Sequence, residues 1–224
     1  SGEMDGSGTY TYNACINDDP LFLDPANDDY HLKGGPTRSP CIDAGDNIHV
    51  TPDVYVDLDG RPRIWQTVDI GCYEGGWLVV DTNSGPYTTI QDAIDASYDG
   101  DTVYLEGGIY SGTGNVDLDF KGKSIRLLGK SGGVTIDCGQ NARGFWFHSA
   151  ESGWASVEQV AVIGGYAQGV GGGGMLIENG SSPLIRHVVF VDCVASPTSV
   201  SCGGGGLCVV DSSPLIWECR LANC

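Results

Sequence analysis

The sequence predicts an all-β fold, a parallel β-helix in which short strands wind into stacked coils. The first observation is a repeat near the C-terminus, where the Gly tract at 171–174 returns 32 residues later at 203–206. The second is that Ser-Ser-Pro at 181–183 returns 31 residues later at 212–214. The third is that each copy holds short apolar runs between Gly, Ser, Pro, Asn and Asp, the residues of tight turns. A fixed period of this length indicates a stacked array.

Three strands and three turns fit into each copy, which makes one coil. In the first copy the apolar runs are 175–177, 184–185 and 188–191. Successive coils then stack at the strand spacing of about 4.8 Å. Because side chains alternate along a strand, four of them are expected inside the tube, one above another. They are Val188, Phe190, Cys219 and Leu221. The Gly tracts suit a corner that needs positive φ or close backbone approach.

The N-terminal third contains separate motifs instead of a repeat. Asp-Pro-Leu-Phe at 19–22, Ser-Pro-Cys-Ile-Asp-Ala-Gly at 39–45 and Val-Asp-Ile-Gly-Cys-Tyr-Glu at 68–74 occur in this order. This order resembles the C-terminal closing segment of secreted bacterial parallel β-helix repeat proteins. The resemblance implies that residues 1–76 are such a closing segment, belonging to a preceding or neighbouring unit.

A Gly-rich junction and a strand at 77–80 lead into the best helix prediction of the chain. Thr88 and Gln91 form a capping-box pattern, and Ile90, Ala93 and Ile94 share one face. A strand is expected directly afterwards, at residues 102–105. The Thr-Ile-Gln-Asp-Ala-Ile-Asp-Ala helix and the Gly-Asp-Thr-Val strand resemble the N-terminal cap of the pectin-lyase-like β-helix. The resemblance implies a right-handed coil whose first turn is covered by this short helix.

Further strands are expected at 124–128, 134–138, 144–147 and 160–163, so residues 77–224 are predicted to be an N-terminal cap followed by coils. The Gly-Gly corner and the Ser-Ser-Pro-x-Ile strand also resemble polymorphic outer-membrane-type repeats. The order of the two parts is unusual, because a closing segment precedes an opening cap. The chain is then a piece cut across two tandem β-helices, a circular permutation, or the subunit of a head-to-tail fibre.

An uncovered β-helix end is a template for strand addition, so we expect the coil that ends at Cys224 to be covered. The cover would come from residues 1–74 of the same chain or of a neighbouring one. The residues expected to take part in capping or assembly are Leu21, Phe22, Ile90, Ile94, Leu207, Val209, Leu215, Ile216, Leu221 and Cys224.

Composition narrows the class of protein. The formal net charge of −18 disfavours binding to nucleic acid or anionic membranes, and no apolar run is long enough to cross a membrane. Nine cysteines in a Gly-rich, Lys-poor, acidic chain favour an oxidising, extracellular setting, and the lack of a C-x-x-C motif gives no indication of zinc or redox chemistry. Cys193 and Cys224 should be stacked neighbours, either bridged or as inward thiols, and Cys202 and Cys208 could close a small loop around the Gly tract.

Candidate chemistry is sparse, and no catalytic residue is predicted. His187 aligns with Glu218 one coil on, which suggests a salt bridge on a turn or a weak acid–base couple. Asp57 and Asp59 begin a Ca²⁺-loop pattern, but the bidentate Glu is missing, so a turn closed by Asp and Gly is favoured. Trp146 could stack on a sugar ring or lie in an interface.

The sequence therefore favours a non-enzymatic extracellular structural or adhesive module that associates head to tail, with carbohydrate as another candidate partner. Apart from the Ca²⁺ at Asp57 and Asp59, no cofactor is expected. The alternative is a carbohydrate-active enzyme of the pectin-lyase-like class, a polysaccharide lyase or glycoside hydrolase. The acidic, Arg and Lys motifs of such enzymes are missing, and fold analogy alone does not supply the activity. Loss of activity on changing Arg186 or His187 would favour the alternative.

Overall fold

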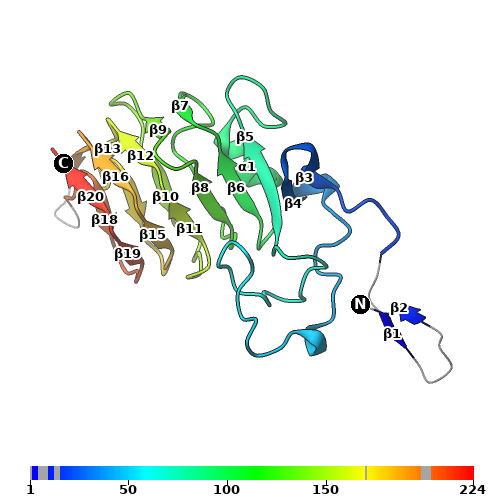
Figure 1. Ribbon diagram of the computed structural model, residues 1–224. Coiled ribbons are helices and arrows are strands. Elements are labelled where there is room, and N and C mark those ends of the chain that lie inside the picture. Colours follow the sequence, from blue (N-terminus) through cyan, green and yellow to red (C-terminus); the bar gives the residue numbers. More distant parts are fainter. Residues whose placement is uncertain (1, 5–9, 13–15, 170, 198–202) are drawn as a thin grey trace. The chain divides into compact units, whose positions relative to one another are not determined.

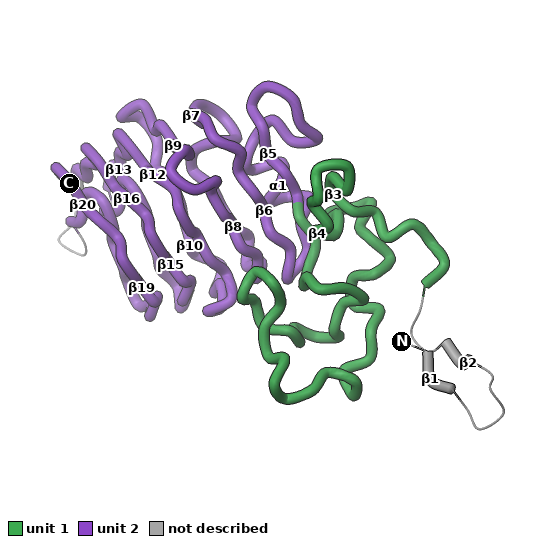
Figure 2. The backbone as a smooth tube through the Cα atoms, viewed as in Figure 1, with its two compact units in different colours: residues 1–77 green, residues 78–224 purple. Residues whose placement is uncertain are grey.

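Short strands provide most of the regular structure in the computed structural model, which describes residues 2–4, 10–12, 16–169, 171–197 and 203–224. The chain divides into two compact units, Ser1–Trp77 and Leu78–Cys224 (Figure 2). The strand β5 (Gly76–Val80) begins in the first unit and ends in the second. Each unit is described by itself below.

Parallel strands wind through the second unit in successive coils, and strands of neighbouring coils lie side by side (Figure 1). The first sheet runs in the order β6 (Thr102–Leu105), β8 (Arg126–Gly129), β11 (Ser156–Glu158), β15 (Leu184–Arg186) and β19 (Leu215–Trp217). The second contains β7 (Gly108–Ser111), β9 (Val134–Asp137), β12 (Ala161–Ile163), β16 (Val189–Val191) and β20 (Arg220–Ala222). The third contains β10 (Phe145–Phe147), β14 (Met175–Ile177) and β18 (Leu207–Val209). A shorter pair is β13 (Tyr166–Gly169) with β17 (Val194–Pro197). This is a parallel β-solenoid of about five turns, as the repeat predicts.

The register between coils agrees with the alignment of the two sequence repeats. Phe190 pairs with Leu221, and Val189 pairs with Arg220. Arg186 pairs with Trp217 on the neighbouring sheet. The prediction that Phe190 and Leu221 occupy equivalent places in one tube is therefore confirmed.

The core of the second unit is a column of inward side chains, one layer per coil. Val157, Val162, Ile185 and Phe190 are fully buried in it, and they alternate with outward residues on their strands. Most of the hydrophobic free energy of this unit comes from such burial, at about 25 cal/mol per Å² of apolar surface.

Sharp corners between the sheets use left-handed residues that stack from coil to coil. Gln159, His187 and Glu218 have φ values of 58°, 53° and 50° at the corner between the first two sheets. Asp192 and Asn223 do the same at the next corner, where the Asn223 side chain donates to Asp192 Oδ1 at 2.9 Å. Polar side chains tolerate this conformation better than branched apolar ones.

The Gly tracts serve close approach of backbones as well as positive φ. A Cβ on Gly174 would lie 2.5 Å from Phe190 Cδ1 and would also overlap the carbonyl oxygen of Gly206. Gly144, one coil earlier, would meet the carbonyl oxygen of Gly174 at 2.5 Å. Gly172, in the first tract, adopts a positive φ of 82°. Glycine at these sites lets the coils pack backbone against backbone.

The helix α1 (Ile90–Ala96) forms where it was expected, but its N-cap differs from the prediction. Thr89 caps the helix, and its Oγ1 accepts a hydrogen bond from the Asp92 N–H at 3.3 Å. The predicted capping box of Thr88 with Gln91 is wrong, because the Gln91 side chain donates instead to Asp95 and to the Asp119 carbonyl. The apolar face of α1 is buried in the core of the unit.

The first unit has few regular elements. β1 (Gly2–Met4) pairs with β2 (Tyr10–Tyr12), and β3 (Phe22–Asp24) pairs antiparallel with β4 (Asp29–Lys33). In the described part of this unit, short 3-10 turns occupy Pro25–Asn27, Gly35–Thr37 and Asn47–His49. Within the described part of the chain, no helix has the length and apolar character to cross a membrane.

Candidate functional site

The terminal coil, residues 203–224 with β18, β19 and β20, exposes side chains that its predecessor buries. Ile216 is 42% exposed, whereas its register partner Ile185 is fully buried. Leu221 is 51% exposed, whereas its partner Phe190 is fully buried. Trp217, on the same coil, is also exposed. Among the described residues, β19 and β20 each pair with a strand on one side only, so their other edges have no strand partner there.

The ten residues expected in capping or assembly fall into two groups. Ile90 and Ile94 are fully buried within the second unit, so they pack α1 onto the coils and offer no surface to another molecule. The other eight retain exposure and are Leu21, Phe22, Leu207, Val209, Leu215, Ile216, Leu221 and Cys224. Within the second unit, the apolar side chains of the terminal coil are exposed, and cover by residues 1–74 of the same chain stays a prediction. Cover by a neighbouring chain likewise stays a prediction.

Cys193 and Cys224 are neighbours, as the repeat predicts. Both are unbridged thiols, and their side chains are within hydrogen-bonding distance of each other. Cys193 is fully buried, and its Sγ also contacts the Val191 carbonyl oxygen at 3.4 Å. The predicted loop between Cys202 and Cys208 involves Cys202, which lies outside the described residues.

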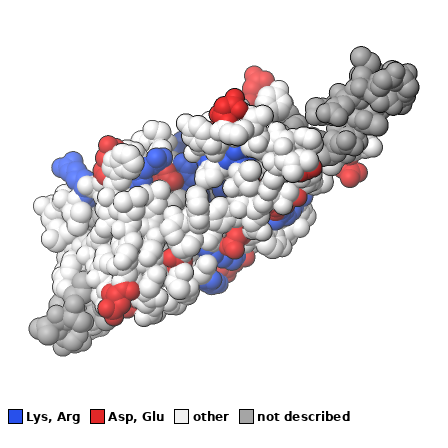
Figure 3. Space-filling view, turned by 90° about the horizontal axis from the view of Figure 1, so that it is seen from below, with Lys and Arg blue, Asp and Glu red and all other residues white. Residues whose placement is uncertain are grey.

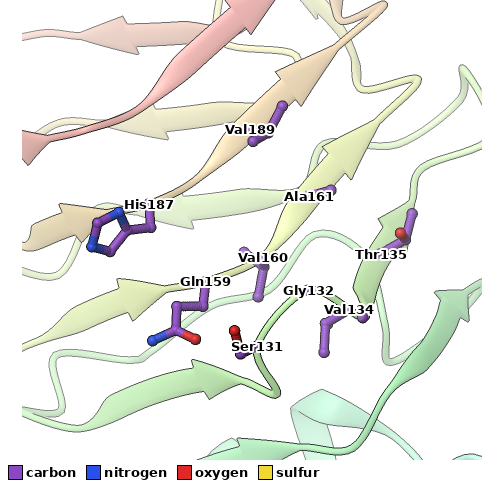
Figure 4. Close-up of a pocket in the computed structure, with 10 residues that line it drawn as sticks. Ser131, Gly132, Val134, Thr135, Gln159, Val160, Ala161, His187 and Val189 are labelled. Atoms are coloured by element: carbon purple, nitrogen blue, oxygen red, sulfur yellow. The ribbon is translucent and has the colours of Figure 1, made fainter.

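A groove of 690 Å³ crosses the corner between the first two sheets (Figure 4). Its lining includes Gln159, His187, Ser131 and Thr135, with Ala161 and Val189 as apolar patches. No Lys or Arg belongs to the lining.

At the edge of this groove, His187 Nδ1 lies 3.1 Å from Glu218 Oε2. This confirms the expected contact between the two corner residues. Both side chains are well exposed, which is the environment of a surface salt bridge worth about 0–1 kcal/mol.

Glu158 forms a buried ion ladder that the sequence did not reveal. Arg126 Nε donates to Glu158 Oε1 at 2.8 Å, and Arg186 Nη2 contacts Oε2 at 2.7 Å. Burial would raise the pKa of Glu158, but the charges of Arg126 and Arg186 and a hydrogen bond from Ser156 hold it below its usual value. Arg186 therefore takes part in a structural ion pair with Glu158. Glu158 and Arg186 are register partners 28 residues apart. This spacing is shorter than the 31 or 32 residues of the C-terminal repeat, so the repeat alignment did not place the two side chains next to each other.

The Asp57 carboxylate accepts hydrogen bonds from backbone N–H groups around it. Its Oδ1 accepts the N–H groups of Asp59 and Arg61 at 2.9 and 2.8 Å, and its Oδ2 accepts that of Glu74 at 2.9 Å. These bonds explain the Asp57–Gly60 turn without a cation. Among the described residues, no group of three or more His, Cys, Asp or Glu side chains is arranged to hold a metal ion. The Ca²⁺ site at Asp57 and Asp59 stays a prediction.

The carboxylate of Asp59 instead takes part in a cluster around His31 in the first unit. His31 Nε2 lies 3.1 Å from Asp59 Oδ2, and Nδ1 lies 2.5 Å from Asp29 Oδ1. The imidazole stacks on Tyr73 and Trp77, with ring centroids 4.0 and 3.9 Å apart. Both ring nitrogens are occupied by carboxylates, so this histidine holds the unit together and offers no nitrogen to a substrate. No sequence pattern predicts this cluster, because its contacts join segments that are far apart in the chain.

Trp146, a candidate sugar-stacking residue, is already in contact with its neighbours. Its ring stacks on His148 at a centroid distance of 4.0 Å, and its Nε1 donates to Glu178 at 2.8 Å. The guanidinium carbon of Arg143 lies 5.9 Å from its ring centroid. These contacts favour the interpretation of Trp146 as a structural residue on the outside of β10.

Charged side chains on the displayed face are scattered, and acidic and basic groups alternate without a large area of one sign (Figure 3). Comparison with models of known protein families, with curated proteins and with solved structures found no match. The fold and the side-chain geometry are therefore the basis for a functional proposal.

Proposed function

We propose that this chain is a non-enzymatic extracellular structural or adhesive module that associates end to end through its terminal coil. The observation that carries this proposal is the exposure of Ile216 and Leu221, whose register partners one coil earlier are fully buried. Covering an apolar layer that has an open strand edge is favourable, because apolar surface is buried and backbone groups find partners.

The partner in this proposal is a second copy of the chain, whose residues 1–74 act as the closing segment. Leu21 and Phe22 are the apolar side chains that this segment would bring to the contact, and both retain exposed surface. The coil is right-handed in this proposal, and α1 covers its first turn. A head-to-tail contact of two different surfaces generates a filament unless it closes into a ring.

The arrangement of charged residues supports a structural role over catalysis. Arg186 is paired with Glu158, and the His187–Glu218 pair is exposed to water. The groove beside His187 is the observation that favours the alternative, a carbohydrate-active enzyme. That alternative predicts turnover of polygalacturonate or alginate in the presence of Ca²⁺, with loss of activity in His187→Gln.

Lysine substitutions on the terminal coil test the assembly. We expect the wild-type chain to sediment as concentration-dependent oligomers and to form filaments visible by electron microscopy. The double variant Ile216→Lys, Leu221→Lys should remain monomeric, because two ammonium groups cannot be buried in an apolar contact without a large cost.

Ile109→Lys is the matched control, since Ile109 is also exposed but lies on β7, at the opposite end of the same sheet from β20. It should assemble like the wild type, and circular dichroism should show that all variants fold. A wild-type chain that stays monomeric at every concentration would overturn the proposal.

A further inference from the structure

We propose that Cys193 and Cys224 are a redox pair, which oxidises to a disulfide joining the terminal coil to the coil before it. Each cysteine follows a strand of the second sheet by two residues, and the strand ends Val191 and Ala222 are register partners. Stacked positions on neighbouring parallel strands lie about 4.8 Å apart, within the Cα separation of about 4.4–6.8 Å that disulfides span. The two side chains already contact each other as thiols.

The surrounding glycines hold the pair in place. A Cβ on Gly206 would lie 3.2 Å from both Cβ and Sγ of Cys224. A Cβ on Gly205 would lie 3.2 Å from the carbonyl carbon of Cys224 and would overlap the Cys193 carbonyl oxygen. The second Gly tract therefore passes directly along the two cysteines, and side chains there would displace them.

The two thiols differ in access to solvent, and this sets the order of reaction. Cys224 is exposed, whereas Cys193 is fully buried. Burial, together with the neighbouring Cys224, raises the pKa of Cys193 to about 11. Because the thiolate is the reactive form, Cys224 reacts first with an oxidant in solution, and Cys193 acts as the resolving cysteine.

The oxidant required is a small-molecule disulfide such as oxidised glutathione. The Cys224 thiolate attacks one sulfur of the oxidant, forms a mixed disulfide and releases one glutathione thiolate. The Cys193 thiolate then attacks the Cys224 sulfur, which breaks the mixed disulfide and expels the second glutathione. Two cysteine thiols become one disulfide, and their two protons and two electrons leave on two molecules of reduced glutathione.

The Cys193–Cys224 disulfide would restrain the terminal coil, which has a neighbouring coil on one side only. The terminal coil pairs with another coil on one side only, so it is the first layer expected to detach in local unfolding. A link from Cys193 to Cys224 ties the end of that coil to β16. Oxidation thus fixes the terminal coil in place, and reduction releases it. This inference does not depend on end-to-end association.

The test uses the full chain, first reduced and then incubated with oxidised glutathione at pH 8. Peptide mass mapping should find a peptide pair linked through Cys193 and Cys224. Amide hydrogen exchange within residues 203–224 should slow by about tenfold or more in the oxidised chain, because opening of the coil is restricted. The assay should be run on monomers, so that the result is separate from assembly.

Cys208 is itself disulfide-bonded in the same coil, so Cys224→Ser should abolish the link and leave only the oxidation-dependent protection that comes from Cys208. Cys219→Ser is the matched control from the same coil, and it should retain the link and its protection, since the Cys219 thiol contacts the Ile185 and Trp217 carbonyls instead. Three outcomes would each overturn the proposal: a stable glutathione adduct on Cys224, linkage of either cysteine to another partner such as Cys138, or unchanged exchange after the link forms.

Discussion

His31 lies between two aromatic rings and two carboxylates. Burial disfavours the imidazolium, but the hydrogen bonds and charges of Asp59 and Asp29 outweigh it and place the pKa of His31 above 6.5. A group whose folded pKa is raised stabilises the native state below its unfolded pKa, and this stabilisation is lost as the pH rises through the folded value. The contribution of His31 therefore declines above about pH 6.5.

A His31→Gln variant tests this linkage. We expect the difference in unfolding free energy between wild type and variant to be largest at pH 6 and to shrink towards pH 9. Burial raises the pKa of Asp69 to about 6 and that of Glu74 to about 8, so they titrate in the same unit and act on both proteins.

Urea denaturation at a series of pH values, followed by tyrosine and tryptophan fluorescence, provides the measurement. His49→Gln serves as the control, because His49 is well exposed. A difference for His31→Gln that does not vary with pH would show that the ring contributes only packing.

At the scale of elements, local sequence patterns located α1 but not its N-cap. The apolar spacing of Ile90, Ala93 and Ile94 located the helix correctly. The cap was misplaced by one residue, because two adjacent threonines both fit the pattern. Thr89 has extended φ and ψ values of −122° and 149°, which suit an N-cap, and Asn115 Oδ1 accepts the Ile90 N–H at 3.0 Å.

Exchanging each threonine separately distinguishes the two caps. Thr89→Ala should lower the unfolding free energy by about 1 kcal/mol, the usual value of an N-cap hydrogen bond. Thr88→Ala should change it by less than about 0.5 kcal/mol. Thermal or urea unfolding measures both. Equal losses would mean that the Asp92 N–H has no preferred partner at the start of the helix.

The strands that the sequence predicted and the strand that it missed differ in how clearly apolar residues mark them. The predicted runs at 102–105 and 134–138 were found almost residue for residue. β11 was missed because Ser156-Val157-Glu158 has one apolar residue, and its outward side chains are stabilised by an ion ladder instead of by apolar contacts. A local pattern cannot reveal a strand whose partners Arg126 and Arg186 belong to other coils.

At the scale of the whole molecule, the sequence predicted what repetition determines and missed what distant contacts determine. The stacking of Phe190 on Leu221 and the pairing of His187 with Glu218 follow from one period applied twice. The cluster around His31 joins segments without any repeat, so no spacing rule could find it. The exposed apolar layer of the terminal coil lies where β19 and β20 are the outermost described strands of their sheets.

The position of a residue along the solenoid should therefore decide the effect of its substitution. Phe190→Ala opens a cavity in a fully buried layer and should cost about 3–5 kcal/mol. Leu221→Ala alters the same position one coil later, where the side chain is half exposed, and should cost less than about 1 kcal/mol in dilute protein.

Urea denaturation at two protein concentrations makes the comparison complete. A loss at Leu221 that grows with protein concentration would show that a second chain covers the layer, because binding to the folded state adds to its stability by mass action. A large loss at Leu221 that is independent of concentration would contradict the exposure of the terminal coil within the monomer. A small loss at Phe190 would contradict the stacked core itself, since each coil contacts only its neighbours and has no other layer to compensate.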